Sequence, residues 1–403
     1  MLIGIPEINF FEAPHWPTNY LHTKFDMERH LFFGWICLIL LAGFAPAKNQ
    51  PFDEHPTLPI GSPAPPFNLQ GVDGKMYSLS SFSEARILVI IFTCNHCPTA
   101  QSYEDRIIKL TSDYRKKGVA VVAIMPNDPK SLRLDEMGFS DLGDSFEDMK
   151  VRASDKNFNF PYLYDGETET VSKAYGPIAT PHVFVFDASR KLRYNGRFDD
   201  MESHDKPPRV NNTRDAIDSL LDNRPIAVPV TKVFGCSVKW SDKRSSVQQS
   251  LDNWAMEPVS ADTISSAGLQ ALFRNESDKL RLIFIWSNSS MASQREFPDL
   301  VAMNRMYRDR DFEFISIHID PGGDQKLVMS FLQKQQASNK NYLYPGADLP
   351  GLLKVTESGT SPVLPYTALV EPGGKRAFEK LGYVDPAQLK KQIVNNHLIG
   401  RYP

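Results

Sequence analysis

The sequence predicts an α/β protein in which one order of strands and helices occurs twice. At 403 residues the chain exceeds what one ordinary hydrophobic core holds, so two domains are expected. An apolar run at 86–92 leads into a close pair of cysteines, Cys94 and Cys97, and a helical pattern follows. A second apolar run at 280–286 precedes a helical pattern at 296–307. The same fold is therefore expected to repeat at the scale of a domain.

The first repeat reads as strand and helix segments in alternation. Short segments on either side of a Gly-x-x-Gly turn at 71–74 predict a hairpin before the apolar strand. The helix after the cysteines is expected to stop at Gly118, because glycine readily takes the left-handed conformation that ends a helix. Further elements are expected as a buried strand at 119–125, helices at 145–157 and 171–175, strands at 183–187 and 192–196, and a last helix at 213–221.

The second repeat follows the same order. Its strands are expected at 280–286, 312–319 and 365–371, and its helices at 296–307, 327–336 and 387–398. Pro-Gly-Gly at 372–374 is typical of a turn after the third strand.

The N-terminal segment predicts export. Residues 27–30 include a basic start, residues 31–44 are apolar, and Ala45-Pro46-Ala47 resembles a cleavage site, which is the order of a secretory signal peptide. The apolar stretch is short for a membrane span, which needs about 20 residues, so an uncleaved anchor is the alternative. Met27 is then the expected start. The full division is a probable non-native extension at 1–26, the signal peptide or anchor at 27–47, a linker at 48–65, the first domain at 66–225, a tail or linker with Cys236 at 226–260, and the second domain at 261–403.

Composition and cysteine content restrict the function. The chain is 41% hydrophobic and 23% charged with a net charge of −3, which fits a soluble globular protein and gives no reason to expect a nucleic-acid partner. Its four cysteines are too few for a structural disulfide framework. Cys37 lies in the signal peptide, so Cys94, Cys97 and Cys236 remain after processing. This arrangement favours redox chemistry over structural disulfides.

The pair Cys94 and Cys97 lies where a strand passes into a helix. The unpaired N–H groups and the dipole of a helix N-terminus stabilise a thiolate, which is the reactive form. We therefore expect Cys94 to be the nucleophile and Cys97, about one turn away, to resolve a mixed disulfide. His96 between them is expected to stabilise the Cys94 thiolate and to make the pair more oxidising. The alternative is a solvent-facing histidine with little effect.

Other uses of the cysteines are less favoured. A zinc site needs two further soft ligands, and only Cys236 and scattered histidines are available. Haem attachment needs a histidine after the second cysteine, where Pro98 stands. No metal and no cofactor are therefore expected. Cys236 is either a third redox thiol that resolves Cys94 or a loop cysteine without a role.

Several stretches carry motifs of known families. In the first repeat they are FTCNHCPTAQSYEDR, DSFEDMKVRA, NFPYLYD, AYGPIATPHVFVFD and TKVFGCSVKW. Through these, residues 66–240 resemble exported thioredoxin-family proteins of the redoxin, AhpC/TSA or peroxiredoxin-like type. Residues 270–403 resemble the TlpA/ResA-like thioredoxin domain through EFPDLVAMNRMYRDRDFEFISI, FLQKQQASNKNYL and LPYTALVEPGGK. The resemblance implies two tandem thioredoxin-like domains, each a central mixed sheet flanked by helices.

The resemblance also implies roles for particular residues. In such proteins the proline matching Pro181 is cis and packs against the cysteine pair, and the residue matching Thr180 offers backbone hydrogen bonds to an extended substrate. An ordinary trans proline that opens a strand is the alternative. Pro365 repeats the position in the second domain. Ser290 and Ser293 stand where the second family has its two cysteines, so the second domain is expected to be redox-inactive.

Two departures from the families concern proton transfer. The buried aspartate that thioredoxins carry before the cysteine pair is Leu88 here, and the glutamate that TlpA-like proteins carry after it is Ala100. The usual proton acceptor of the resolving thiol is therefore expected to be missing. Glu104 and Asp105 on the following helix are expected to be solvated.

The expected function is a thiol–disulfide oxidoreductase that acts through Cys94 and Cys97 on exported protein disulfides, in the periplasm or cell envelope. As a reductase it would need a membrane electron donor. The alternative is a peroxiredoxin-like, antioxidant thiol peroxidase with Cys94 as peroxidatic cysteine, although no threonine lies three residues before Cys94 or Cys97. A binding or scaffold protein is the third possibility, since the second domain could only bind. The sequence leaves substrate, redox direction and oligomeric state open.

Overall fold

The computed structural model describes residues 55–201, 207–319, 324–345, 352, 354, 356 and 363–400. The expected extension and signal peptide, residues 1–26 and 27–47, lie outside these ranges. Within them, none of the helices combines the length and the apolar character needed to cross a membrane.

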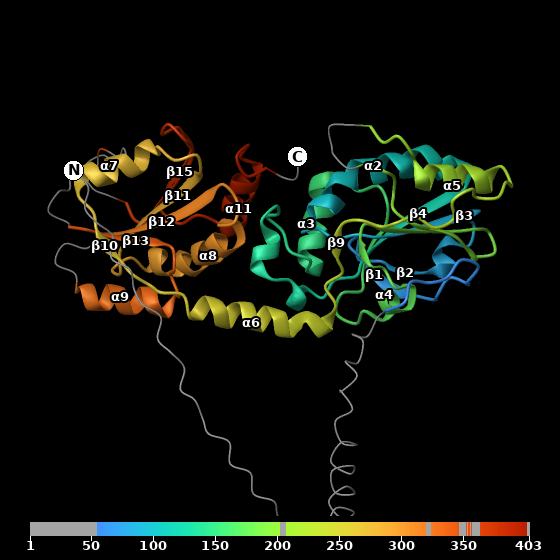
Figure 1. Ribbon diagram of the computed structural model, residues 1–403, viewed down its shortest axis with the longest axis horizontal. Coiled ribbons are helices and arrows are strands. Elements are labelled where there is room, and N and C mark those ends of the chain that lie inside the picture. The colour runs from blue at the N-terminus through green and yellow to red at the C-terminus, as the bar shows by residue number, and fades with distance from the viewer. Residues whose placement is uncertain are drawn as a thin grey trace, which may run out of the picture. The chain divides into compact units, whose positions relative to one another are not determined.

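The first domain follows the predicted order (Figure 1). Its elements are β1 (Asn68–Gly71), β2 (Met76–Ser78), β3 (Ile87–Phe92), α2 (Pro98–Tyr114), β4 (Val119–Met125), α3 (Phe146–Lys156), β5 (Tyr162–Tyr164), α4 (Thr170–Tyr175), β6 (Ala179–Thr180), β7 (His182–Phe186), β8 (Leu192–Gly196) and α5 (Asn212–Leu221). Short 3-10 helices complete it, among them η2 (Arg115–Lys117), η3 (Pro129–Ser131) and η4 (Leu134–Met137).

Seven strands form the sheet of the first domain, in the order β2-β1-β5-β4-β3-β7-β8. Strand β3 lies parallel to β4 and antiparallel to β7. Because alternate residues of a strand point to opposite faces, Val89 and Ile91 pack with α2 and α5, whereas Leu88 and Ile90 pack with α4. Helices therefore cover both faces (Figure 1), and every residue of β3 is buried.

The second domain repeats this arrangement. Its sheet has the order β10-β13-β12-β11-β14-β15, and β11 lies parallel to β12 and antiparallel to β14. The elements are β10 (Asp262–Thr263), α7 (Ser266–Arg274), β11 (Leu280–Trp286), α8 (Met291–Tyr307), β12 (Phe312–Ile319), α9 (Gln325–Lys334), β13 (Lys340–Tyr344), β14 (Tyr366–Val370), β15 (Arg376–Leu381) and α11 (Pro386–Asn395). The predicted fold class, two tandem thioredoxin-like domains of mixed sheet and flanking helices, is confirmed.

The segments assigned to linkers contain more structure than the sequence predicts. Residues 226–260 hold β9 (Cys236–Ser237), η5 (Ser241–Lys243) and α6 (Arg244–Ala255). In the upstream linker, Gly61 and Ala64 donate backbone hydrogen bonds to the first domain, at 2.8 Å each. Prolines and polar residues suggested linkers, but tertiary hydrogen bonds fix the described residues 55–65 and 226–260 in place.

Residues 126–145, which join β4 to α3, contact the second domain. Met137 packs among the core side chains of that domain, on the face of α8. The hydroxyl of Tyr307 donates to the carbonyl of Ser140 at 2.9 Å, and Arg310 donates to the carbonyl of Gly138 at 3.2 Å. The second domain therefore holds a loop that belongs to the first.

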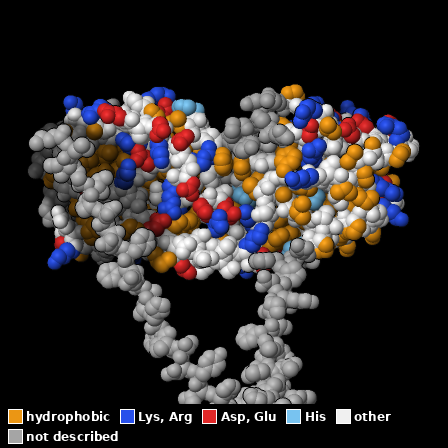
Figure 2. Space-filling view, viewed as in Figure 1, with side chains coloured by type: hydrophobic (Ala, Val, Ile, Leu, Met, Phe, Trp, Pro, Cys, Tyr) orange, Lys and Arg blue, Asp and Glu red, His pale blue; other side chains and the backbone are white. Residues whose placement is uncertain are grey.

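Charged side chains of both signs are interspersed over the face seen in Figure 2, with no large area of one sign. This distribution agrees with the small net charge of −3.

The buried His182 on β7 gives the fold a pH dependence. Its ring is 1% exposed, and burial lowers its pKa to about 3. The unfolded chain therefore takes up this proton first as the pH falls, and the stability that neutral His182 supplies above pH 6.5 is lost below it. Between pH 7 and pH 5 the loss is about 2 kcal/mol. Urea unfolding at the two pH values measures this loss. We expect the free energy of unfolding of His182→Gln to fall by about 2 kcal/mol less than that of the unmodified protein between pH 7 and pH 5. Equal pH dependence in both proteins would contradict the assignment.

Candidate active site: three thiols at the end of strand β3

Two of the thiols lie between β3 and α2. Helix α2 begins at Pro98, a residue favoured at the first helical position because its missing N–H has no partner there anyway. Cys97 is consequently the N-cap of the helix, and its Sγ accepts a hydrogen bond from the backbone N–H of Ala100 at 3.4 Å. Cys94 lies before the helix. The free N–H groups that the sequence analysis assigned to Cys94 are thus directed at Cys97.

Thr180, the residue before Pro181, lies against both sulfurs. The Thr180–Pro181 peptide bond is cis, as predicted, and so is Leu364–Pro365 in the second domain. The Sγ of Cys94 is 3.1 Å from the hydroxyl of Thr180. The thiol of Cys97 lies 3.4 Å from the carbonyl oxygen of the same residue. The three residues that the sequence placed in the site are therefore in contact.

Cys236 supplies a third thiol. Strand β9 pairs antiparallel with β6, with Thr180 opposite Cys236. The backbone N–H of Cys236 donates to the Sγ of Cys97 at 3.4 Å. The sequence analysis considered Cys236 as a partner of Cys94; the structure brings it to Cys97 instead.

His96 forms a buried ion pair with Asp144. Its Nδ1 lies 2.5 Å from the Oδ2 of Asp144, and both side chains are at most 1% exposed. The other contacts of Asp144 are all donors: the backbone N–H groups of Asn95 at 2.9 Å and His96 at 3.2 Å, and the side-chain amide of Asn127 at 2.7 Å. The alternative of a solvent-facing His96 is therefore wrong.

Electrostatics distinguish the sulfurs. Burial opposes ionisation of Cys97, but hydrogen bonds from the Cys236 and Cys94 thiols, the charge of His96 and the Ala100 N–H together bring its pKa well below the usual range. For Cys94, burial and then the hydrogen bond with Cys97 raise the pKa. The hydrogen bond with Cys97, followed by burial, raises that of Cys236. The thiolate of the reduced site is thus held on Cys97, with protonated thiols on either side.

The ion pair is stable in its charged form. Burial alone would lower the pKa of His96, but the charge of Asp144 and the hydrogen bond with it raise the pKa overall. Burial likewise opposes ionisation of Asp144, yet His96 and Asn127 lower its pKa. The pair therefore favours the protonated form of His96 beside the cysteines.

Asp144 is the functional residue that the sequence analysis missed. The analysis predicted that a buried carboxylate was lacking because Leu88 and Ala100 occupy the family positions. Asp144 supplies one from the loop before α3, where it precedes the Ser145 N-cap. An acidic residue next to a helix start was indistinguishable from an ordinary capping residue. Glu104 also differs from expectation, since it is 5% exposed and paired with Arg152 at 2.6 Å.

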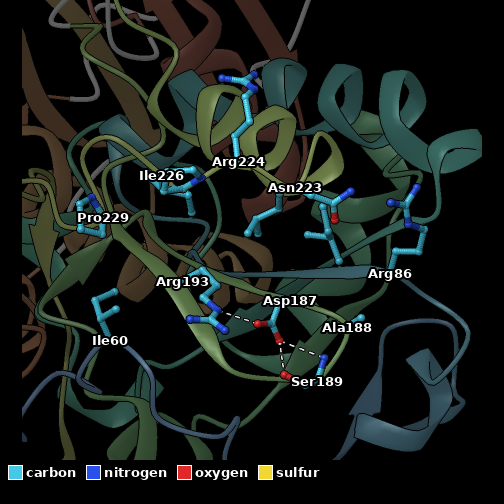
Figure 3. A pocket seen from close by; sticks show the side chains of 13 residues that line it. Ile60, Arg86, Asp187, Ala188, Ser189, Arg193, Asn223, Arg224, Ile226 and Pro229 are labelled. Carbon is cyan, nitrogen blue, oxygen red and sulfur yellow. Dashed lines mark hydrogen bonds and ion pairs between the residues drawn. The ribbon is translucent and has the colours of Figure 1, made fainter.

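The site is closed. Cys94 is 2% exposed and Cys97 is 0% exposed, so neither sulfur is open to solvent. A cavity of about 640 Å³ lies elsewhere, lined by Arg86 and Ile87 at the other end of β3, about 20 Å along the strand. Figure 3 shows its Asp187 linked to Ser189 and Arg193. That cavity has no part in the thiol chemistry.

Three side chains of the site are of the kinds that bind metal ions. Ligand atoms of Cys94, His96 and Asp144 all lie within 4.8 Å of one another. Sulfur, imidazole and carboxylate together are a donor set that suits Zn²⁺. These are the residues that would hold such an ion.

The corresponding site of the second domain has no thiol. Ser290 is the N-cap of α8, with its hydroxyl accepting from the Ser293 N–H at 3.2 Å. Glu296 follows at the position that Ala100 occupies in the first domain. It is 1% exposed and accepts hydrogen bonds from Thr367 and Val384, each at 3.2 Å. The carboxyl group absent after Cys97 is thus present after Ser293.

Glu296 predicts a pH effect of opposite sign to that of His182. Burial raises its pKa to about 7. Its contribution to stability is therefore complete below its unfolded pKa, near 4.5, and is lost as the pH rises through about 7. We expect Glu296→Gln to stabilise the protein at pH 8 by on the order of 2 kcal/mol and to change little at pH 4. Denaturant midpoints at the two pH values measure this, with the exposed Glu276→Gln as control. A loss of stability at pH 8 would contradict it.

The sheet order, the thiols at the β3–α2 junction and the proline beside them define a thioredoxin-like redox protein. Residues 60–195 match the AhpC/TSA family. Through this first domain the chain belongs to the thioredoxin family. The match ends before β9, so Cys236 lies outside it.

Solved structures include similar proteins. An uncharacterized conserved protein from Geobacillus kaustophilus is 38% identical, over 45% of this chain and 93% of that one, with a TM-score of 0.41. A hypothetical protein from Sinorhizobium meliloti is 30% identical, over 46% and 97%, with a TM-score of 0.41. A thiol:disulfide interchange protein of the thioredoxin family from Chlorobium tepidum is 19% identical, over 41% and 99%, with a TM-score of 0.30. Among curated proteins none matches this sequence.

Proposed function

We propose that the protein is a thiol–disulfide oxidoreductase that uses Cys94 and Cys97 as its redox pair on the disulfides of exported proteins. The observation that carries the proposal is the hydrogen bonding of Cys97. Its sulfur accepts hydrogen bonds from the backbone N–H groups of Ala100 and Cys236, each at 3.4 Å. A thiolate held in this way is a good leaving group when an incoming thiolate attacks Cys94.

The two sulfurs then have different roles. A substrate thiolate attacks Cys94 of the Cys94–Cys97 disulfide, the S–S bond breaks, and Cys97 leaves as the stabilised thiolate. A second substrate thiol attacks the substrate sulfur of the mixed disulfide and releases Cys94, which takes up a proton. Two electrons pass from the substrate dithiol to the protein. In the reverse direction, Cys97 resolves the mixed disulfide on Cys94.

The buried ion pair favours the oxidising direction. The charge of protonated His96 lowers the pKa of Cys97, and Asp144 raises the pKa of His96. Stabilising the thiolate stabilises the reduced protein, which makes its disulfide a stronger oxidant. His96 and Asp144 thus act as positioning residues for the charge.

Turnover with defined substrates tests the proposal. The full chain, with Cys37→Ser throughout, is mixed in oxidised form with a synthetic peptide that carries two cysteines. Disulfide formation in the peptide is followed by mass spectrometry. Cys94→Ser and Cys97→Ser are each expected to abolish it, and the double variant Ser290→Ala/Ser293→Ala is the matched control that retains it. Full activity in Cys94→Ser would overturn the proposal.

A thiol peroxidase is the second candidate. The observation in its favour is the burial of both sulfurs, because a hydroperoxide is small enough to enter where a folded protein is not. In that case the Cys94 sulfur attacks a peroxide oxygen, and the O–O bond breaks to release an alcohol or water and leave a sulfenic acid on Cys94. Cys97 then condenses with the sulfenic acid, which forms the Cys94–Cys97 disulfide and releases water. Consumption of hydrogen peroxide by the reduced protein, much faster than exchange with the peptide, would favour this function.

The place of action is proposed to be the periplasm or cell envelope. Support comes from the signal-like residues 27–47 of the sequence. Sequencing the N-terminus of the protein recovered from intact cells tests it, with cleavage after Ala47 as the expected result. An electron donor in the membrane is needed only if the pair acts as a reductase.

A further inference from the structure

Cys236 is held at the redox pair by several independent contacts. It is 139 positions from Cys97 in the chain, yet its N–H reaches the Cys97 sulfur at 3.4 Å. Pairing of β9 with β6 sets it opposite Thr180, and the Thr180 hydroxyl lies 3.5 Å from the Cys236 carbonyl. Backbone pairing therefore fixes the register that brings the third thiol to Cys97.

The residues on both sides of Cys236 hold this segment close to the redox pair. Gly235 has φ of +135°, and a Cβ there would meet the carbonyl oxygen of Thr180 at 2.0 Å, so the close approach requires glycine. On the other side, the N–H of Lys239 donates to Asn127 at 2.9 Å, and its ammonium group pairs with Glu136 at 2.6 Å. Residues 235–239, which we term the strap, are thus anchored rather than loosely packed.

Cys97 is the central sulfur of the three. Cys94 precedes it by three residues, and the backbone N–H of Cys236 reaches its sulfur at 3.4 Å. Two different disulfides can therefore form at this one sulfur. A structural cysteine in an apolar core would show no such arrangement, since nothing would direct its thiol at another sulfur.

We propose that Cys236 is a third redox residue, which forms a disulfide with Cys97 in exchange for the Cys94–Cys97 disulfide. The proposal deepens the oxidoreductase function and rests on it, because that function supplies the Cys94–Cys97 disulfide. In the step, the Cys236 thiolate attacks the Cys97 sulfur, the Cys97–Cys236 bond forms and the Cys94–Cys97 bond breaks. Cys94 leaves with the electron pair and takes up the proton that Cys236 gave up. The step is an isomerisation and needs no further oxidant.

The exchange changes what the site presents to a partner. With the disulfide at Cys94–Cys97, the strap is held only by hydrogen bonds and packing. An extended chain could then pair with Thr180 by displacing it, since a free strand edge recruits peptide strands. With the disulfide at Cys97–Cys236, the strap is covalently fixed and Cys94 is a free thiol. Cys236 thereby gives the protein a second oxidised form that excludes a strand from this edge.

Disulfide mapping of a matched pair of variants tests the proposal. Full-length Cys94→Ser and the double variant Cys94→Ser/Cys236→Ser, both with Cys37→Ser, are equilibrated with oxidised and reduced glutathione. Free thiols are then alkylated and the peptides are mapped without reduction. We expect Cys94→Ser to form a Cys97–Cys236 disulfide and the double variant to carry glutathione on Cys97. Because tethering gives millimolar or higher effective concentration, the internal disulfide should exceed the glutathione adduct about tenfold at submillimolar glutathione disulfide.

Oxidation of the protein with all three active-site cysteines distinguishes the role of Cys236 from the oxidoreductase function itself. This protein should give both the Cys94–Cys97 and the Cys97–Cys236 peptides. If this protein formed the Cys94–Cys97 disulfide and neither it nor Cys94→Ser formed a Cys97–Cys236 disulfide, the role of Cys236 as a third redox residue would be overturned. The oxidoreductase function would remain intact. Absence of both disulfides would overturn the oxidoreductase itself. A Cys94–Cys236 disulfide as the main product would also contradict the proposal, because it bypasses Cys97.

Discussion

Replacing Asp144 by alanine is expected to lower the free energy of unfolding by about 3–5 kcal/mol. The carboxylate is fully buried and accepts hydrogen bonds from the Asn95 and His96 backbone and from Asn127. Its removal leaves those donors unpaired and leaves the buried His96 without its counter-charge, and both are costly in a low-dielectric interior. Urea unfolding followed by circular dichroism measures the loss.

Glu147→Ala is the matched control for this prediction. Glu147 lies three positions away in the first turn of α3, but its side chain is 78% exposed and its ion pair with Lys150 is on the surface. Such pairs contribute about 0–1 kcal/mol. Similar effects of the two variants would show that the buried ion pair does not stabilise the first domain. Asp144→Asn should fall between them, since it keeps acceptor capacity and loses only the charge.

The reduced protein is expected to contain one thiolate at neutral pH, and that thiolate is expected on Cys97. A thiol at a helix N-terminus beside a cation has a pKa of about 3.5–7.5, against about 8.5 for a free cysteine. Ultraviolet absorbance of the thiolate, followed during pH titration, should show a step below the range of a free cysteine that Cys97→Ser removes and Cys94→Ser retains. His96→Asn should shift the step upward by about one unit, because the positive charge is lost.

The titration also shows which cysteine carries the thiolate, because the sequence predicts Cys94 and the structure favours Cys97. If the low step disappeared in Cys94→Ser and persisted in Cys97→Ser, the thiolate would belong to Cys94, and the roles in the mechanism would be reversed. Cys236→Ala provides an internal comparison. It keeps the backbone N–H that donates to Cys97 but has no side-chain donor, so the step should move upward without disappearing.

Local patterns predicted most of the fold. Gly118 ends the α2 region with φ of +80°, as expected of a glycine after a helix, and Ser145 caps α3. Both are decided by residues within one turn of the position itself. The cis bond before Pro181 was predicted from the resemblance to a family rather than from local chemistry.

The parts of the site that escaped prediction depend on contacts between distant segments. Asp144 is 48 positions from His96, and Cys236 is 139 from Cys97. No spacing rule links such pairs. The exchange of roles between Cys94 and Cys97 has a local cause, however. Pro98 starts α2 directly after Cys97, whereas α8 of the second domain starts directly after Ser290, the counterpart of Cys94. The proline was a usable signal for the later start.

The burial of Cys94 and Cys97 has a kinetic consequence. A large partner that collides with the closed protein finds no sulfur to attack, so we expect its reaction to wait for a local opening of the site. Observed rates should then rise with partner concentration only up to a plateau that equals the rate of opening. This limiting rate should be the same for every large partner, whatever the reactivity of its thiols.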